Sequence, residues 1–272
     1  MKYLAALLLL TLSATAFAAK IVCTTYPVWL LTRCVAHNAK VSVNLMTPPH
    51  GGCAHNYTPL AGDLIKVKHP ETILIANGSQ VDEHLIAAAK RANPQLPLIK
   101  AEVASRDAHT FASPDTAKLM VVKIATELCI LDPANAPYYQ KNLQMILPRF
   151  DELIQRTQAL NLNGKVIVLH HKLFVNLANL CHAKTLLLKH EQASAVPPRD
   201  LMDLIRNTRQ HNTIAIWAEN HHHDPAVKLL ARETSLKIVE LDMLNGGSMD
   251  VPFDHYINVM QCNLDKLEKF MR

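Results

Sequence analysis

The sequence predicts an α/β protein in which two parallel-sheet lobes are joined by one long backbone helix. Three observations carry this prediction. Short apolar strands alternate with helices over residues 20–100, the same alternation returns over residues 165–270, and a long helical stretch lies between them. Strands that alternate with helices are typical of parallel sheets covered on both faces. With 49% hydrophobic residues, the chain has enough apolar surface for the cores of both lobes.

Residues 1–18 have the features of a cleaved export signal. A lysine precedes a short apolar run, and Ala16-Phe17-Ala18 forms a small-x-small cleavage motif. The run is too short for a stable membrane anchor, and the first cysteine, Cys23, does not lie at a lipidation position. We therefore expect cleavage after Ala18 and a secreted, periplasmic protein.

The first lobe is expected over residues 19–132. Its strands are predicted at residues 20–25, 40–46, 72–76 and 96–100, and its helices near residues 27–35, 60–68 and 81–91. Ser113-Pro114-Asp115 begins a further helix, with an N-cap serine, a proline at the first helical position and an acid in the first turn. Because its continuation over residues 117–131 is strongly apolar, we expect that segment to be buried.

The linking helix is expected over residues 133–160. Its apolar residues form one stripe at helical spacing, namely Tyr139, Leu143, Ile146, Phe150 and Ile154. At the standard rise per residue the helix is about 40 Å long. Pro148 removes a hydrogen bond and crowds the carbonyl four residues earlier, so we expect a kink there.

The second lobe is expected over residues 161–272 and repeats the pattern of the first. Strands are predicted at residues 165–170, 185–189, 213–218 and 236–241, and helices at residues 199–209, 225–233 and 254–270. In open parallel sheets, ligands bind beyond the carboxyl ends of the strands. Residues that directly follow strands are therefore the first candidates for a functional site.

Side chains that bind metal follow four of the predicted strands. His55 follows the second strand of the first half, and His109 follows the fourth. His171 follows the first strand of the second half, and Asp242 follows its last. If the lobes face each other, three imidazoles and a carboxylate converge, which is a complete four-coordinate set for Zn²⁺. The chain also has 15 histidines in 272 residues, an excess that points to a transition metal.

Four segments, in order along the chain, carry a family resemblance. They contain His55-Asn56-Tyr57-Thr58-Pro59 after Pro49-His50-Gly51, then Ala108-His109-Thr110-Phe111, His171-Lys172-Leu173-Phe174 and Leu241-Asp242-Met243-Leu244. These segments resemble the ligand segments of the zinc and manganese solute-binding proteins of bacterial ABC transporters, the ZnuA/TroA-like or cluster A-I family. The chain departs from the family pattern with Phe111 in place of the usual tryptophan and with Asn56 where an acid often follows the ligand.

The resemblance implies two four-stranded lobes bridged by a single helix, with the metal bound between them. It implies His55, His109, His171 and Asp242 as ligands, and Phe174 three places on favours His171 over its neighbour His170. Glu219 falls on a family glutamate that is usually not a direct ligand. The protein is then a periplasmic solute-binding protein, not an enzyme, that captures a divalent metal ion and delivers it to an ABC transporter membrane permease.

The type of ligand favours zinc as the metal. Imidazole suits zinc, copper and nickel, whereas manganese prefers more oxygen donors. Manganese-favouring members of the resembled family often carry a carboxylate at the third position, where this chain has His171. Mn²⁺ and Fe²⁺ remain alternatives.

Two other functions remain open, a zinc-dependent hydrolase and a periplasmic metal store or chaperone. A three-histidine and carboxylate site can activate water, but the sequence has no His-Glu-x-x-His motif and no nucleophile elbow. Its lysines are scattered, so we expect no nucleic-acid binding, and we expect a monomer. The pairing of the six cysteines is open, as are auxiliary metal-binding roles for His50, Cys53 and the run from His221 through His222 to His223.

Overall fold

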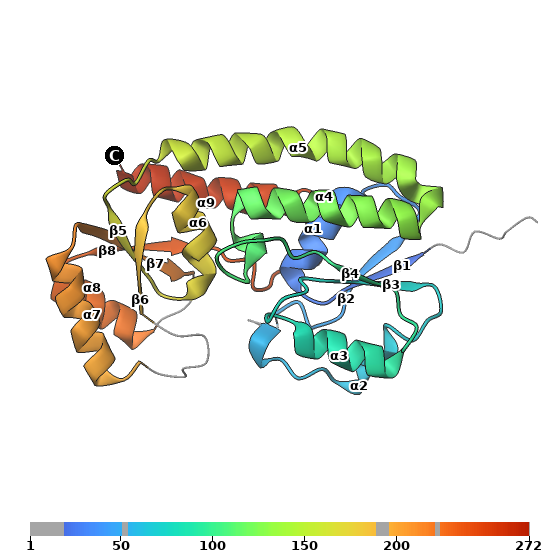
Figure 1. The fold of residues 1–272 in the computed structure, drawn as a ribbon, viewed down its shortest axis with the longest axis horizontal. Helices are drawn as coiled ribbons and strands as arrows, with labels where there is room; N and C mark the ends of the chain where they lie inside the picture. Colours follow the sequence, from blue (N-terminus) through green and yellow to red (C-terminus); the bar gives the residue numbers. More distant parts are fainter. Residues whose placement is uncertain (1–18, 51–53, 189–195, 221–223, 272) are drawn as a thin grey trace, which may run out of the picture.

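The structure is a computed structural model, which describes residues 19–50, 54–188, 196–220 and 224–271 (Figure 1). The expected export signal, Cys53 and the histidines at 221–223 lie outside these residues, so their roles stay predictions. The cysteines that the structure describes are all unpaired. In the described part of the chain, no helix is both long enough and apolar enough to cross a bilayer.

The N-terminal lobe contains a four-stranded parallel sheet in the order β2-β1-β3-β4. Its elements are β1 (Lys20–Cys23), α1 (Tyr26–Ala36), β2 (Ser42–Leu45), α2 (Ala61–Ile65), β3 (Thr72–Ala76), α3 (Glu83–Ala92) and β4 (Leu98–Lys100). Every residue of the central strand β3 is buried, as expected for a strand covered by helices on both faces. The predicted alternation is confirmed, although α2 is shorter than expected.

The C-terminal lobe repeats this topology with the order β6-β5-β7-β8, again all parallel. Its elements are β5 (Val166–Leu169), α6 (Val175–Leu180), β6 (Lys184–Leu187), α7 (Pro198–Gln210), β7 (Thr213–Glu219), α8 (Pro225–Thr234), β8 (Lys237–Leu241) and α9 (His255–Met271). The predicted fold class of two parallel-sheet lobes is therefore confirmed. The sequence analysis did not identify α6, because six residues are too few to show a helical period.

Two packed helices follow the first sheet, α4 (Pro114–Leu131) and α5 (Ala136–Ala159). The 24 residues of α5 extend about 36 Å along both lobes (Figure 1). The helix continues through Pro148, and the kink expected there stays a prediction. The expectation that residues 117–131 of α4 are completely buried is wrong. The helix buries only one face, and the side chain of Ile130 on the other face is 73% exposed.

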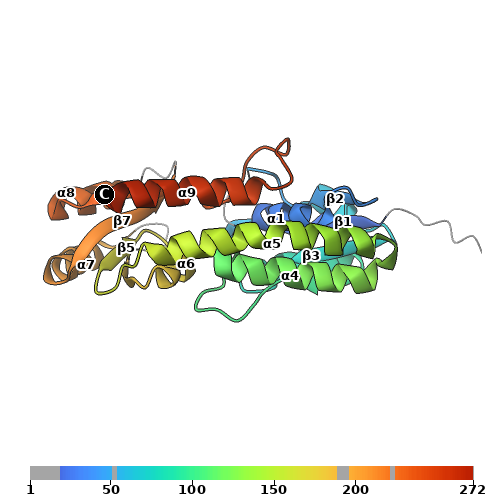
Figure 2. The ribbon, with the colours of Figure 1, turned by 90° about the horizontal axis from the view of Figure 1, so that it is seen from above.

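A second helix, α9, lies beside α5 and also reaches the N-terminal lobe (Figure 2). Arg156 of α5 bonds to Glu268 at 3.0 Å and to Asp265 at 2.6 Å. At the other end of α9, the hydroxyl of Tyr256 donates to the carbonyl of Phe111 at 2.8 Å. Two helices therefore brace the lobes, where the sequence predicted one.

Candidate metal centre

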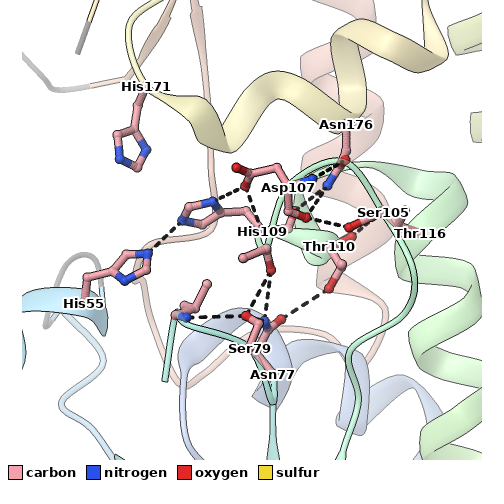
Figure 3. A network of polar contacts seen from close by, with 12 residues as sticks. His55, Asn77, Ser79, Ser105, Asp107, His109, Thr110, Thr116, His171 and Asn176 are labelled. Atoms are coloured by element: carbon pink, nitrogen blue, oxygen red, sulfur yellow. Dashed lines mark hydrogen bonds and ion pairs between the residues drawn. The ribbon is translucent and has the colours of Figure 1, made fainter. Parts of the chain in front are cut away.

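The three predicted histidine ligands come together at the boundary between the lobes (Figure 3). His55 lies in the short helix η1 (Ala54–Asn56), and His109 directly precedes η2 (Thr110–Ala112). His171 follows β5 and comes from the opposite lobe. The centre of the His109 ring is 5.3 Å from that of His55 and 5.4 Å from that of His171. His109 thus stands between one ligand from its own lobe and one from the other.

The separation of two imidazole nitrogens fits a shared zinc ion. The Nε2 atoms of His55 and His109 are 3.3 Å apart. Two nitrogens bound to zinc at about 2.05 Å with a tetrahedral angle lie about 3.3 Å apart as well. Within the described ranges, no three histidine, cysteine, aspartate or glutamate side chains are already close enough to hold a metal ion. His171, whose ring centre lies 5.4 Å from that of His109, is the candidate for the third bond.

The surroundings of His171 keep its imidazole neutral. Burial lowers the pKa of His171 to about 4, and the nearby imidazoles, His109 foremost, act in the same direction. Asp107 opposes the shift but does not cancel it. Because an imidazole must be neutral to bind metal, His171 has no proton to lose at neutral pH.

Asp107 contacts His109 directly, and the sequence analysis did not identify it. Its Oδ1 accepts hydrogen bonds from the Nδ1 of His109 at 2.5 Å and from the backbone N–H of His109 at 2.9 Å. Burial disfavours the charge of Asp107, but the hydrogen bonds from His109 and the charges of His109 and Lys172 outweigh it and hold the pKa of Asp107 below its usual value. A carboxylate on Nδ1 orients the ring and strengthens Nε2 as a metal ligand.

The turn after β3 supports the His109 loop from within the N-terminal lobe. The side chains of Asn77 and Ser79 donate to the carbonyl of Ala108 at 3.0 and 3.3 Å (Figure 3). Asp82, which is fully buried, accepts the backbone N–H groups of Asn77 and Gly78 at 2.7 and 2.9 Å. Burial raises the pKa of Asp82 despite these bonds. The backbone next to His109 is therefore fixed to the sheet beneath it.

The loop that follows His55 is fixed in a similar way. The Nε2 of His84 on α3 donates to the carbonyl of Tyr57 at 2.8 Å. The hydroxyl of Tyr57 in turn donates to Asp63 at 2.5 Å, and the backbone N–H of Leu60 donates to the same carboxylate oxygen at 2.9 Å. These bonds attach the segment to α2 and α3, so the backbone that follows His55 has a fixed position.

Asp242 directly follows β8, as predicted, but its carboxylate is engaged locally. Its Oδ1 accepts the backbone N–H of Leu244 at 2.9 Å and so caps the turn that follows the strand. With His50 and Glu219, Asp242 also lines a hollow of about 380 Å³. Its role as the fourth metal ligand stays a prediction.

The neighbours His170 and His171 have different partners. The Nδ1 of His171 lies 3.9 Å from Oε1 of Glu219, whose other oxygen accepts from Asn245 at 2.9 Å. The Nε2 of His170 lies 3.2 Å from the carboxylate of Asp224, which caps α8. Successive side chains at the end of a strand diverge, so only His171 belongs to the group that contains His55 and His109.

A small cavity adjoins His109. Its lining includes Thr47, Tyr57 and Phe111 from the N-terminal lobe and Asn245 from the C-terminal lobe, and its volume is about 20 Å³. A single water or ion needs a space of about this size, whereas pockets for small organic ligands are typically 300–1,000 Å³. This cavity therefore suits a water or an ion better than an organic solute.

Known proteins share this architecture over most of the chain. The family described as zinc-uptake complex component A, periplasmic (ZnuA), matches residues 21–270. The high-affinity zinc uptake system protein ZnuA of Bacillus subtilis is 28% identical over 170 residues, which cover 60% of this chain and 52% of that protein. The manganese ABC transporter substrate-binding lipoprotein PsaA of Streptococcus mitis is 22% identical over 245 residues, which cover 80% of this chain and 79% of that protein.

Solved structures have the same fold. The solute-binding protein FpvC of Pseudomonas aeruginosa, in complex with Ni²⁺, superposes with a TM-score of 0.83 at 22% identity and covers 94% of this chain and 97% of its own. A crystal structure of ZnuA superposes with a TM-score of 0.76 at 20% identity and covers 93% and 99% of the two chains. The matched region of the chain spans about half the length of the Bacillus relative, 52%.

Proposed function

Because the chain belongs to the family of the periplasmic zinc-uptake component A, we propose that it captures Zn²⁺ in the periplasm and delivers it to an ABC transporter permease. One relative is named as a high-affinity zinc uptake protein and another as a manganese ABC transporter substrate-binding lipoprotein. Zinc in particular is favoured by the donor set, since three imidazoles suit zinc better than manganese. His55, His109 and His171 are the proposed ligands, with Asp242 as the predicted fourth.

The observation that carries this proposal is the paired arrangement of His55 and His109. Their Nε2 atoms have the separation of two zinc ligands, and the carboxylate of Asp107 holds the second ring through Nδ1. Capture then begins at this pair. His171, already neutral, completes the three-histidine set from the other lobe, so that the bound ion connects the two lobes.

Elemental analysis of protein purified without chelator and without a histidine tag tests which metal is carried. Titration under chelator competition should then show one tight equivalent of Zn²⁺ and weaker binding of Mn²⁺. His55→Ala should remove the tight step, whereas His211→Ala, a histidine exposed at the end of α7, should leave it unchanged. Equal loss in both variants, or a tighter Mn²⁺ step, would contradict the zinc proposal.

The alternatives of hydrolysis and storage make different predictions. The matched family and relatives are named for metal uptake and transport, so hydrolysis receives no support from them. A storage protein binds zinc but does not transfer it. Zinc uptake into vesicles that contain the cognate permease and ATPase should therefore depend on the loaded protein, and uptake without it would favour storage.

A further inference from the structure

Asn176 on α6 forms hydrogen bonds across the boundary between the lobes (Figure 3). Its side-chain amide donates to the carbonyl of Asp107 at 3.0 Å and to that of His109 at 3.4 Å. Its Oδ1 accepts the backbone N–H of Asp107 at 3.3 Å. Although Asn176 is polar, it is only 5% exposed. A residue of the C-terminal lobe thus binds the backbone on both sides of the residue that orients His109.

The position of Asn176 in the chain connects it to a second ligand. It lies five residues after His171, and η4 (Lys172–Phe174) and the first turn of α6 join the two without an intervening loop. His171 and Asn176 therefore move together. On the other side, Asp107 binds His109 through both its backbone N–H and its Nδ1. A short sequence of contacts thus leads from His171 through Asn176 and Asp107 to His109.

We propose that Asn176 is a positioning residue that fixes the spacing of His109 and His171 across the lobe boundary. This inference rests on the proposed function as a metal-binding protein. Distances from a metal ion to its ligands lie within about 0.2 Å of standard values, so the relative positions of ligands from two lobes have to be set closely. Asn176 sets that spacing locally, within a few residues of the ion.

Without Asn176, the His109 loop loses its three bonds to α6 and keeps the bond from Tyr256 of α9 to the carbonyl of Phe111 and its anchors within the N-terminal lobe. Asn77 and Ser79 still bind the carbonyl of Ala108, so the loop stays attached to its own sheet. The distance from His109 to His171 then varies with the relative placement of the lobes. The expected effect is weaker metal binding with an intact fold.

Two substitutions and a matched control test this role. Asn176→Ala removes all three bonds. Asn176→Asp keeps the size but places a carboxylate against two carbonyl oxygens, so it should be at least as harmful. Asn179→Ala is the control, because Asn179 is a partly exposed asparagine on the same helix. We expect both Asn176 variants to bind one equivalent of Zn²⁺ about 10–100-fold more weakly, as for other residues that orient metal ligands, and Asn179→Ala to match the wild type.

The visible absorption of bound Co²⁺ separates positioning from general destabilisation. A change in ligand geometry alters the band shape of a saturated Co²⁺ complex, whereas a mere loss of stability does not. Altered bands in the Asn176 variants, with wild-type bands in Asn179→Ala, would support the inference. Wild-type affinity and bands in either folded Asn176 variant would overturn it; if Asn176→Ala does not fold, Asn176→Asp decides. If the wild type itself binds neither Zn²⁺ nor Co²⁺, the proposed function fails first, and this inference fails with it.

Discussion

Replacing Asp107 should weaken zinc binding in two separable steps. In Asp107→Asn the amide oxygen can still accept the Nδ1–H of His109, so the ring orientation is retained and only the negative charge is lost. In Asp107→Ala both are lost. Removing a partner of a metal-ligating histidine typically costs 10–100-fold in affinity, which is about 1.4–2.7 kcal/mol. We therefore expect zinc affinity to fall about tenfold in Asp107→Asn and about a hundredfold in Asp107→Ala.

The geometry supports a large effect. The Asp107 side chain is 9% exposed and lies 2.5 Å from the ring that it orients, so water does not easily replace it. Its pKa is held below the usual range, which means that it stays ionised from pH 6 to pH 8.

Chelator competition measures both variants against Asp200→Asn, which removes an exposed carboxylate in the first turn of α7. Calorimetry or circular dichroism confirms that each variant is folded. The reasoning is refuted if Asp107→Ala binds zinc as tightly as Asp200→Asn. Equal losses in Asp107→Asn and Asp107→Ala would show that charge alone matters and that ring orientation contributes nothing.

Three further predictions concern the site and the lobe boundary. His171→Ala should weaken zinc binding far more than His170→Ala, as measured by titration, and the reverse order would identify the wrong histidine as a ligand. The pKa of folded His171 is about 4, below the ordinary 6.5, so the unfolded chain binds more protons than the folded one between these pH values. The metal-free protein should therefore lose up to about 3 kcal/mol of unfolding free energy as pH falls from 6.5 to 4. Denaturant titrations over this pH range should show a smaller loss in His171→Ala. Gly246→Ala should lower the melting temperature, since a Cβ there would lie 2.4 Å from the carbonyl of Pro49 in the other lobe and overpacking costs about 1–3 kcal/mol. In Gly62→Ala the added Cβ would have nothing within 4 Å, so this variant should have an unchanged or higher melting temperature. An equal fall in melting temperature in both variants would show that the contact between the lobes is unimportant.

The sequence predicted the two lobes and the proximity of three histidines, because both follow from the order of strands and helices along the chain. Alternating strands and helices indicate a parallel sheet, and residues that follow its strands lie at one edge. The proximity of His55, His109 and His171 could therefore be predicted. Asp107 and Asn176 could not. Their roles depend on a loop from one lobe meeting a short helix from the other, and no spacing in the sequence encodes that contact.

For Asp242 the sequence predicted the position but not the contacts. Its position at the end of β8 was predicted correctly, but the sequence did not predict the bond from the backbone N–H of Leu244 to its Oδ1, and its role as a metal ligand stays a prediction. Likewise, the apolar sequence of α4 suggested complete burial, whereas Ile130 is exposed on its outer face. Composition indicates how much apolar surface a helix carries, but its neighbours decide how much of that surface they cover.

The pairing of α5 with α9 has a consequence for how the molecule unfolds. One continuous hydrophobic core contains Val28 and Ile124 of the N-terminal lobe together with Leu169 and Trp217 of the C-terminal lobe, and Tyr256 of α9 belongs to it as well. Releasing α9 from one lobe uncovers apolar surface on the other. The two sheets are separate in topology, but their lobes share one hydrophobic core. Heat should therefore unfold both lobes in a single cooperative transition, with neither lobe remaining as a folded fragment.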